Sequence, residues 1–293
     1  MKLLITGGTG FLGRRAAAHF AALGVHVLTP GRTQLDITED ASVRNWFVHN
    51  RPEAVLHCAA VSDTGACQRE PERTADVNVA GAARLAVACA DAGAKLIFCS
   101  SDQVYSGSVL PGPHLETESL LPGMVYARQK LEAEQRCAIL CPDMVSLRLS
   151  WMYTTRPLPG EHGHFLATLL AALREGNLPL RWPVYDCRGI TDAAAVVDRL
   201  PAALALPAGV YNFGAANDVD TFHTVQAVLA EPAVQRAMQK AGLSDPLTRL
   251  VPDTQAFADV PRDIRMDPAR TAAAGIVFDT TRQGLCAALE KVL

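Results

Sequence analysis

The sequence predicts an α/β fold in which a doubly wound parallel sheet is followed by a smaller C-terminal α+β lobe. Two observations support this prediction. Short apolar runs alternate with helical stretches over residues 1–150, and a cluster of glycines joins the first apolar run to the first helical stretch. Strands that are apolar throughout are typical of a parallel sheet covered by helices on both faces.

Five apolar runs are expected to be strands of this sheet. Glycine, proline or polar residues bound each run, and stretches with helical periodicity fill the intervals between them. Parallel strands end at one edge of a sheet, and such folds bind ligands at that edge. The expected strands cover residues 2–6, 25–29, 53–58, 95–99 and 144–149, and the expected helices cover residues 11–23, 41–50, 72–92 and 124–140.

The alternation becomes less regular after residue 150, where proline and glycine are more frequent. We therefore predict a first domain over residues 1–150 and a second lobe over residues 151–293, with some segments of the lobe returning to the first domain. Further elements are expected in the second half, namely helices at 164–175, 192–205, 221–240 and 281–292 and a strand at 209–213.

The glycine cluster follows the first expected strand directly. Glycine permits a tight turn and lets the backbone approach a pyrophosphate, while the N-terminus of the next helix offers unpaired N–H groups. This strand–loop–helix context predicts a dinucleotide-binding domain of the Rossmann type over residues 1–150. The residues expected to contact the dinucleotide here are Gly7, Gly10, Phe11, Leu12 and Gly13.

The end of the second expected strand bears on the choice of cofactor. NAD-specific sites usually place Asp or Glu there, to bind the ribose 2′-hydroxyl. This chain has Thr-Pro-Gly-Arg at residues 29–32, and Arg32 could pair with a 2′-phosphate. We therefore expect NADP(H) to be preferred, with NAD(H) as an alternative.

The composition excludes several classes of protein. The 293 residues carry a net charge of −3, with 49% hydrophobic and 19% charged residues. No basic excess predicts a nucleic-acid partner, and no apolar run is long enough for a bilayer. The N-terminal strand runs straight into the glycine cluster, so we expect no signal peptide and a cytoplasmic protein. Eight scattered cysteines without a Cys-x-x-Cys pair predict reduced thiols and no metal site.

Tyr126 and Lys130 are the candidate chemical centre. Residues four apart on a helix share a face, so a Tyr-x-x-x-Lys pattern brings the two side chains together. A free tyrosine has a pKa of about 10, and a nearby ammonium together with oxidised cofactor favours the phenolate. Ser101 follows the fourth expected strand, where its hydroxyl could hydrogen-bond a substrate carbonyl.

Together these motifs resemble the extended short-chain dehydrogenase/reductase family. The glycine loop, His57-Cys58-Ala59-Ala60, Asn78 and the Ser101/Tyr126/Lys130 set carry the resemblance. Within that family the chain is most similar to the dTDP-4-dehydrorhamnose reductase group. Further shared stretches are Leu35-Asp36-Ile37-Thr38, the run at residues 100–107, Arg148-Leu-Ser-Trp151-Met-Tyr153 and Arg265-Met-Asp267.

The resemblance implies hydride transfer to or from C4 of a sugar nucleotide. Tyr126 would protonate the keto oxygen, Ser101 would bind it, and Lys130 would hold the nicotinamide ribose and tune Tyr126. It also implies that the second lobe binds the substrate and that a homodimer could form. The remaining residues implied for the cofactor are Arg32, Asp36, Ile37, Cys58, Ala59, Ala60, Asn78 and Ser100, and those implied for the substrate are Ser62, Asp102, Gln103, Trp151 and Arg188.

Departures from the pattern leave two alternatives open. His57-Cys58 replaces a usual Asn, and the loop at residues 188–191 differs from the usual Gly-x-Pro-Thr. The first alternative is a sugar nucleotide epimerase or dehydratase on the same fold. Gln103 stands where dehydratases carry Glu and cannot exchange a proton, which argues against dehydration. The second alternative is a non-catalytic regulatory relative.

Overall fold

The fold is described by a computed structural model that covers residues 1–158, 161, 164–175 and 178–293. Within these residues no helix is both long and apolar enough to cross a membrane. The chain forms two compact units. Unit 1 comprises Met1–Ser106, Ser119–Leu149 and Val197–Asn212, and unit 2 comprises Gly107–Glu118, Ser150–Val196 and Phe213–Leu293.

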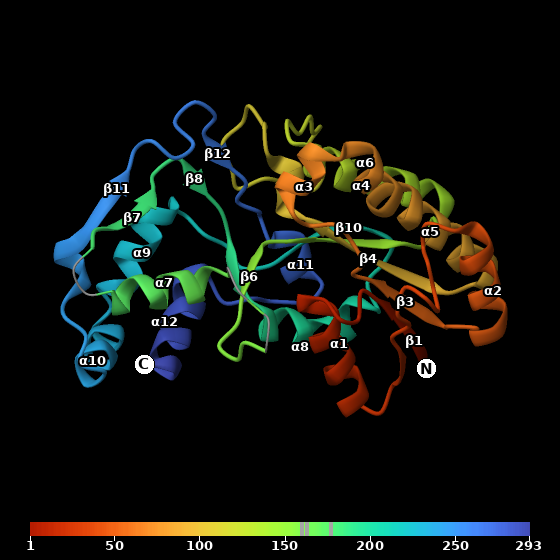
Figure 1. Cartoon of the computed structure of the whole chain (residues 1–293), viewed down its shortest axis with the longest axis horizontal. Helices are drawn as coiled ribbons and strands as arrows, with labels where there is room; N and C mark the ends of the chain where they lie inside the picture. Colours follow the sequence, from red (N-terminus) through yellow and green to blue (C-terminus); the bar gives the residue numbers. More distant parts are fainter. Residues whose placement is uncertain (159–160, 162–163, 176–177) are drawn as a thin grey trace. The chain divides into compact units, whose positions relative to one another are not determined.

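Unit 1 is built around a sheet of six strands in the order β10-β5-β4-β3-β1-β2 (Figure 1). The pairings β2–β1, β1–β3, β3–β4 and β4–β5 are all parallel. The chain adds β2 on one side of β1 and β3 on the other, which creates a topological switch point at the carboxyl ends of β1 and β3. The strands are β1 (Lys2–Thr6), β2 (His26–Leu28), β3 (Ala54–His57), β4 (Lys95–Ser101), β5 (Val145–Leu149) and β10 (Gly209–Phe213).

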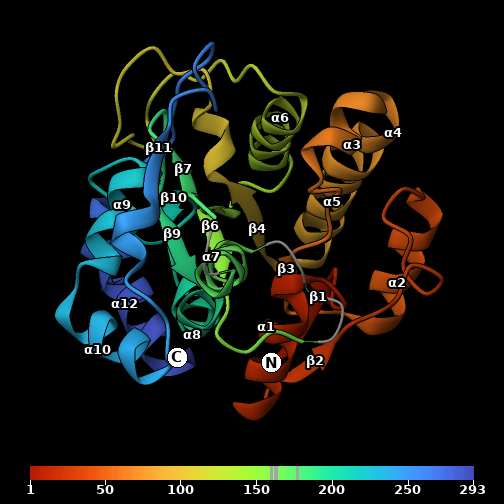
Figure 2. The ribbon, with the colours of Figure 1, turned by 60° about the vertical axis from the view of Figure 1, so that its left-hand side comes forward.

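Helices pack on both faces of this sheet, so the predicted doubly wound fold class is confirmed. Figures 1 and 2 show α5 (Ala82–Ala92) and α6 (Val125–Leu140) on one face and α1 (Phe11–Ala22) on the other. On the first face, α2 (Asp40–Asn50), α5 and α6 bury a shared apolar cluster against the strands. Burial of such side chains stabilises a domain by about 1.5–3 kcal/mol each.

The helix expected over residues 72–92 is divided into three parts. It begins as α4 (Pro71–Ala75), continues as the π-helix η1 (Asp76–Gly81) and ends as α5. A π turn contains one more residue than an α turn and is rare. Apolar periodicity does not reveal such a turn, which here is accompanied by side-chain hydrogen bonds of Asn78.

The described residues of unit 2 form three two-stranded sheets and a group of helices. Its core combines aromatic and aliphatic side chains from residues 153–190 with others from 225–289. Bridging of His114 to Met266 attaches the excursion Gly107–Glu118 to this unit. The strand pairs are β6 (Trp151–Tyr153) with β9 (Ile190–Asp192), β7 (Leu180–Pro183) with β11 (Leu250–Asp253), and β8 (Asp186–Cys187) with β12 (Arg262–Asp263).

One long helix expected in this half is two helices. The structure has α9 (Thr221–Leu229) and α10 (Pro232–Lys240) where the sequence predicted a helix over residues 221–240. Pro232 has no N–H to donate and therefore fits the first turn of a new helix better than a helix interior. The other helices that involve this half are α7 (Phe165–Arg174), α8 (Ala193–Ala203), α11 (Ala269–Ala273) and α12 (Thr281–Val292).

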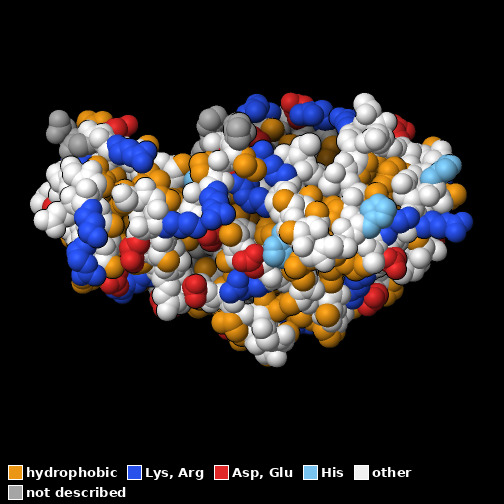
Figure 3. Space-filling model, turned by 90° about the horizontal axis from the view of Figure 1, so that it is seen from below, with side chains coloured by type: hydrophobic (Ala, Val, Ile, Leu, Met, Phe, Trp, Pro, Cys, Tyr) orange, Lys and Arg blue, Asp and Glu red, His pale blue; other side chains and the backbone are white. Residues whose placement is uncertain are grey.

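Charged side chains of both signs share the surface. On the face shown in Figure 3, lysine and arginine are interspersed with aspartate, glutamate and apolar side chains. This agrees with the small net charge of −3.

Candidate active site

The glycine loop joins the carboxyl end of β1 to the N-terminus of α1. Gly7 has a φ of +66°, a conformation that residues with a side chain rarely adopt. A Cβ at Gly7 would lie 2.8 Å from the backbone nitrogen of Ala59, and one at Gly13 would overlap the carbonyl oxygen of Gly7. Gly10 is the N-cap of α1 and brings no side chain to its first N–H groups. The loop is thus compact and presents backbone N–H groups that suit a phosphate.

His57 ties the ends of β1 and β3 together. Its Nδ1 is hydrogen-bonded to Thr6 Oγ1 at 2.7 Å, and the N–H of Ala59 donates to the same hydroxyl at 3.3 Å. Burial, followed by the charge of Lys130, lowers the pKa of His57 to about 3. The imidazole is therefore neutral at physiological pH and acts as a hydrogen-bonding link between the two strand ends.

Two thiols lie beside this link. The Sγ atoms of Cys58 and Cys99 are 3.6 Å apart, and hydrogen bonding between them raises the pKa of Cys58 well above its ordinary value, with burial adding to the effect. All eight cysteines are free thiols. The Cys58 thiol thus remains protonated at neutral pH.

The segment after β2 carries a carboxylate that the sequence analysis did not connect with Arg32. Arg32 is 77% exposed, and its Nε donates to Asp36 Oδ2 at 3.0 Å. Thr38 donates to Asp36 Oδ1 from its hydroxyl and its backbone nitrogen. These bonds, with a smaller contribution from Arg32, lower the pKa of Asp36 to about 2. Ile37 is buried against Gly81, as a Cβ on that glycine would touch its side chain at 3.0 Å.

Ser101 and Tyr126 meet at the end of β4. Ser101 is the last residue of β4, and Tyr126 lies in the first turn of α6 with 8% of its surface exposed. The Ser101 hydroxyl hydrogen-bonds Tyr126, donates to Asp102 Oδ1 at 3.1 Å and accepts from Gln103 N at 3.2 Å.

Burial raises the pKa of Tyr126, and the negative charge of Asp102 adds to the effect, whereas the bond to Ser101 opposes it. The sequence argument expected Lys130 and oxidised cofactor to lower this pKa. In the protein alone, desolvation is the larger influence and keeps the phenol protonated.

Lys130 is fixed to the same strand end. Its Nζ donates to the carbonyl of Cys99 at 2.7 Å and lies 4.7 Å from the ring centre of Phe98. The side chain is only 4% exposed, and burial lowers its pKa. The ammonium is thus held by backbone and ring contacts of β4.

Two buried polar atoms beside Ser101 have no hydrogen-bond partner within the described part of the chain. They are Ser100 Oγ and the side-chain oxygen of Gln103. Buried polar atoms in native proteins are nearly always paired, so orphans of this kind indicate a missing ligand or water. Both residues belong to the set that the sequence associated with cofactor or substrate.

Asn78 is occupied by protein contacts. It is 1% exposed, and its amide is hydrogen-bonded to the backbone of Val61 and to Gln129. Gln129, which lies between Tyr126 and Lys130, was missed by the sequence analysis. Ser62, which follows Val61, is exposed.

Trp151 and Arg188 come together in unit 2. The guanidinium carbon of Arg188 lies 4.9 Å from the ring centre of Trp151, and the Trp151 ring meets Phe165 edge-on at 5.6 Å. Asn217 Nδ2 donates to the Arg188 carbonyl at 2.8 Å and fixes its backbone. This pair combines a flat ring with a buried cation, which suits recognition of a ring and an anionic group.

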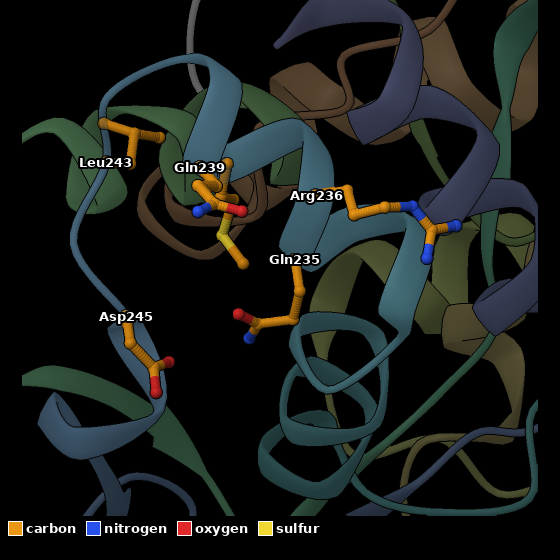
Figure 4. Close-up of a pocket in the computed structure, with 6 residues that line it drawn as sticks. Gln235, Arg236, Gln239, Leu243 and Asp245 are labelled. Atoms are coloured by element: carbon orange, nitrogen blue, oxygen red, sulfur yellow. The ribbon is translucent and has the colours of Figure 1, made fainter.

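Other parts of the described chain offer less chemistry. No group of three or more His, Cys, Asp or Glu residues there could hold a metal ion. A pocket beside α10 is lined by Gln235, Arg236, Met238, Gln239, Leu243 and Asp245, none of them predicted site residues (Figure 4).

Comparisons with known proteins identify the family of the chain. The sequence profile described as "RmlD substrate binding domain" matches residues 1–293. The dTDP-4-dehydrorhamnose reductase of Streptomyces griseus is 32% identical over 290 residues, which cover 94% of this chain and 88% of that protein. The enzyme of the same name from Mycolicibacterium smegmatis is 36% identical over 168 residues, which are 57% of this chain and only 50% of that protein.

A solved structure shows the same fold. The dTDP-4-dehydrorhamnose reductase of Bacillus anthracis, determined in complex with NADP, superposes with a TM-score of 0.82. It is 20% identical, and the superposition covers 99% of this chain and 98% of that one.

Proposed function

Because this chain belongs to the RmlD substrate-binding domain family, we propose that it is a nicotinamide-dependent reductase of a 4-keto sugar nucleotide, similar to dTDP-4-dehydrorhamnose reductase. NADP(H) is its preferred cofactor. The observation that carries the proposal is the hydrogen-bonded Ser101–Tyr126 pair with a protonated phenol, next to a lysine anchored on the same strand. A non-catalytic relative has no need for this arrangement.

The residues of unit 1 fit a dinucleotide. The glycine loop leaves no room for side chains where backbone and ligand would meet, and orphaned polar atoms of Ser100 and Gln103 lie next to Ser101. Gly7, Gly10 and Gly13 would receive the pyrophosphate, Asp36 and Ile37 would lie along the adenine, Ala59 and Ala60 would lie along the dinucleotide, and Lys130 would hold the nicotinamide ribose. The bound cofactor supplies the hydride.

The chain supplies the proton and the orientation. In the proposed complex the Ser101 hydroxyl turns its proton from Asp102 to the keto oxygen, and Tyr126 transfers its proton to that oxygen as negative charge develops there. The raised pKa of Tyr126 suits this role, because a general acid must carry its proton at working pH. Lys130 is anchored by Cys99 and needs little reorganisation during the step.

The preference for NADP(H) rests on Arg32. Asp36 engages its Nε, and the two terminal nitrogens would donate as a pair to a 2′-phosphate. The cost is that Asp36 also lies close to any 2′-phosphate. We infer that the guanidinium outweighs this repulsion, because Arg32 pairs directly with Asp36 Oδ2 while Thr38 donates two hydrogen bonds to Oδ1.

The function can be tested by following NADPH absorbance in the presence of a dTDP-4-keto-6-deoxyhexose mixture that includes the 3,5-epimerised form. We expect oxidation that depends on the sugar nucleotide. Binding of NADPH without oxidation would contradict the proposed reaction, and purification with tightly held NAD would favour epimerisation.

A further inference from the structure

Gln129 is fully bonded inside the protein although it lies between Tyr126 and Lys130. Its side chain is 5% exposed. Its Oε1 accepts from Asn78 Nδ2 at 2.8 Å, while Nε2 donates to the carbonyl of Pro71 at 2.9 Å and to Thr74 Oγ1 at 3.0 Å. The amide therefore connects α6 to both α4 and η1.

Asn78 in turn holds the backbone of Val61 at two points. Its Oδ1 accepts from Val61 N at 2.8 Å, and its Nδ2 donates to Val61 O at 3.0 Å. This bidentate pairing satisfies both the N–H and the C=O of Val61, as a neighbouring β-strand would. Val61 directly follows Ala59 and Ala60, and the backbone of Ala59 lies against Gly7 of the glycine loop.

Val61 is also part of the wall around Tyr126. It packs on a small cluster formed by Cys67, Val125 and Tyr126. Cys67 Sγ donates to the Val61 carbonyl at 3.3 Å, which adds a third hydrogen bond to the backbone of Val61. The position of Val61 thus fixes one side of the phenol ring.

The π-helix η1 provides the place for Asn78. Turns of this kind concentrate at functional sites, because the extra residue shifts the directions of the side chains around it. Gly81 closes the turn, and a Cβ there would lie 3.0 Å from Ile37. A regular helix over residues 72–92 would place Asn78 differently relative to Val61.

We propose that Asn78 and Gln129 form an amide clamp that positions Tyr126 against the cofactor-binding edge by holding Val61, and that Asn78 is a positioning residue rather than a cofactor ligand. This inference rests on the proposed function. The clamp acts on the orientation of the phenol and leaves the glycine loop unchanged. Its loss should therefore reduce kcat far more than cofactor affinity.

The first test compares Gln129→Met and Asn78→Ala with the wild type. We expect kcat to fall by about 10- to 100-fold, the scale of a small misplacement of a reacting group, with the Kd for NADPH changed by less than about threefold. The kcat of the double variant should be no lower than that of the less active single variant, because both substitutions disrupt the same hydrogen-bonded unit. Gln135→Met, at an exposed position of the same helix, and Tyr211→Phe, which removes a partly buried hydrogen bond to the Pro207 carbonyl, should retain kcat.

A second readout does not depend on turnover. Ionisation of Tyr126 is measured as tyrosinate absorbance, with Tyr126→Phe in each background as the blank. Burial is the main cause of the raised pKa, and Asp102, Cys67 and Cys99 are the neighbouring groups that add to it. Water entering beside a displaced Val61 should lower the pKa of Tyr126 in both clamp variants.

These outcomes separate the two proposals. If the wild type reduces no keto-sugar nucleotide, the function fails, while the tyrosinate titration still decides on the clamp. Unchanged kcat and unchanged tyrosinate ionisation in both folded variants would overturn the clamp. A large loss of NADPH affinity in Asn78→Ala with kcat preserved would also overturn it and make Asn78 a cofactor ligand.

Discussion

Units 1 and 2 hold their proposed functional residues in different ways. In unit 1, Ser101, Tyr126 and Lys130 come from one strand end and the first turns of the helix packed near it, and each is tied to nearby backbone or hydroxyl groups. In unit 2, Trp151 and Arg188 belong to separate segments and meet in a cation–π contact. The comparison teaches that the proposed catalytic residues are held by a local strand–helix unit, whereas the proposed substrate-binding pair depends on long-range packing.

The largest expected effect concerns Tyr126, one of the proposed catalytic residues of unit 1. Tyr126→Phe should reduce turnover by about 100-fold or more, the usual scale for loss of a general acid. Binding of NADPH, measured by fluorescence, should remain close to wild type, because the glycine loop is untouched. Tyr185→Phe removes an exposed phenol from unit 2 and is the matched control. Equal turnover in the Tyr126 variant would remove this residue from the mechanism.

The next prediction concerns Arg188, one of the proposed substrate-binding residues of unit 2. Arg188→Leu should raise KM for the sugar nucleotide by about 10- to 100-fold, because it deletes a charge-assisted hydrogen bond to an anionic group. NADPH affinity should not change, since its proposed ligands lie in unit 1. Arg181→Leu, at an exposed position of β7, should leave KM as it was. A loss of NADPH binding in Arg188→Leu would contradict the proposal that unit 1 binds the cofactor and unit 2 recognises the substrate.

A smaller effect is expected at the adenine end of unit 1. Arg32→Ala should weaken NADPH binding by about 10-fold and leave NADH binding nearly unchanged, as one exposed charge pair to the 2′-phosphate is lost. Arg44→Ala, on the exposed side of α2, serves as the control. If the wild-type protein binds NADH more tightly than NADPH, the assignment of Arg32 is wrong.

The smallest effect concerns Asp36. Its pKa is lowered to about 2 from an ordinary value of 3.8, chiefly by hydrogen bonds from Thr38. A lowered folded-state pKa contributes stability above the unfolded value and loses it as pH falls through the folded value. Asp36→Asn should therefore cost under about 1 kcal/mol near pH 7, and the cost should shrink between pH 4 and pH 2. Urea unfolding at several pH values measures it, and a pH-independent difference would contradict this cause.

Much of unit 1 could be predicted from its sequence. The strand at 2–6, the glycine loop and the Tyr126/Lys130 spacing are local patterns, and their meaning depends on a few consecutive residues. The structure places β1 at Lys2–Thr6 and both side chains on α6. The fold class is confirmed, whereas the individual roles of the site residues remain predictions.

Other features could not be found in this way because they depend on partners that are distant in sequence. The π turn at η1 is accompanied by the hydrogen bond between Asn78 and Val61. The importance of Gln129 is visible only from its hydrogen bonds to Pro71, Thr74 and Asn78. The packing of the excursion Gly107–Glu118 in unit 2 likewise depends on His114 meeting Met266. A signal was available for one error, since Pro232 marks the break in the expected helix over residues 221–240.

Direct transfer of hydride to C4 of the sugar is the central claim, and isotope transfer tests it most directly. NADPH carrying deuterium at C4 of the nicotinamide, tested as each of its two stereoisomers, would be incubated with the protein and the dTDP-4-keto-6-deoxyhexose mixture. Mass spectrometry and NMR of the product would then locate the label. We predict one deuterium at C4 of the reduced hexose from one of the two stereoisomers. A product without deuterium from either stereoisomer, or one epimerised without net reduction, would contradict the proposed reaction.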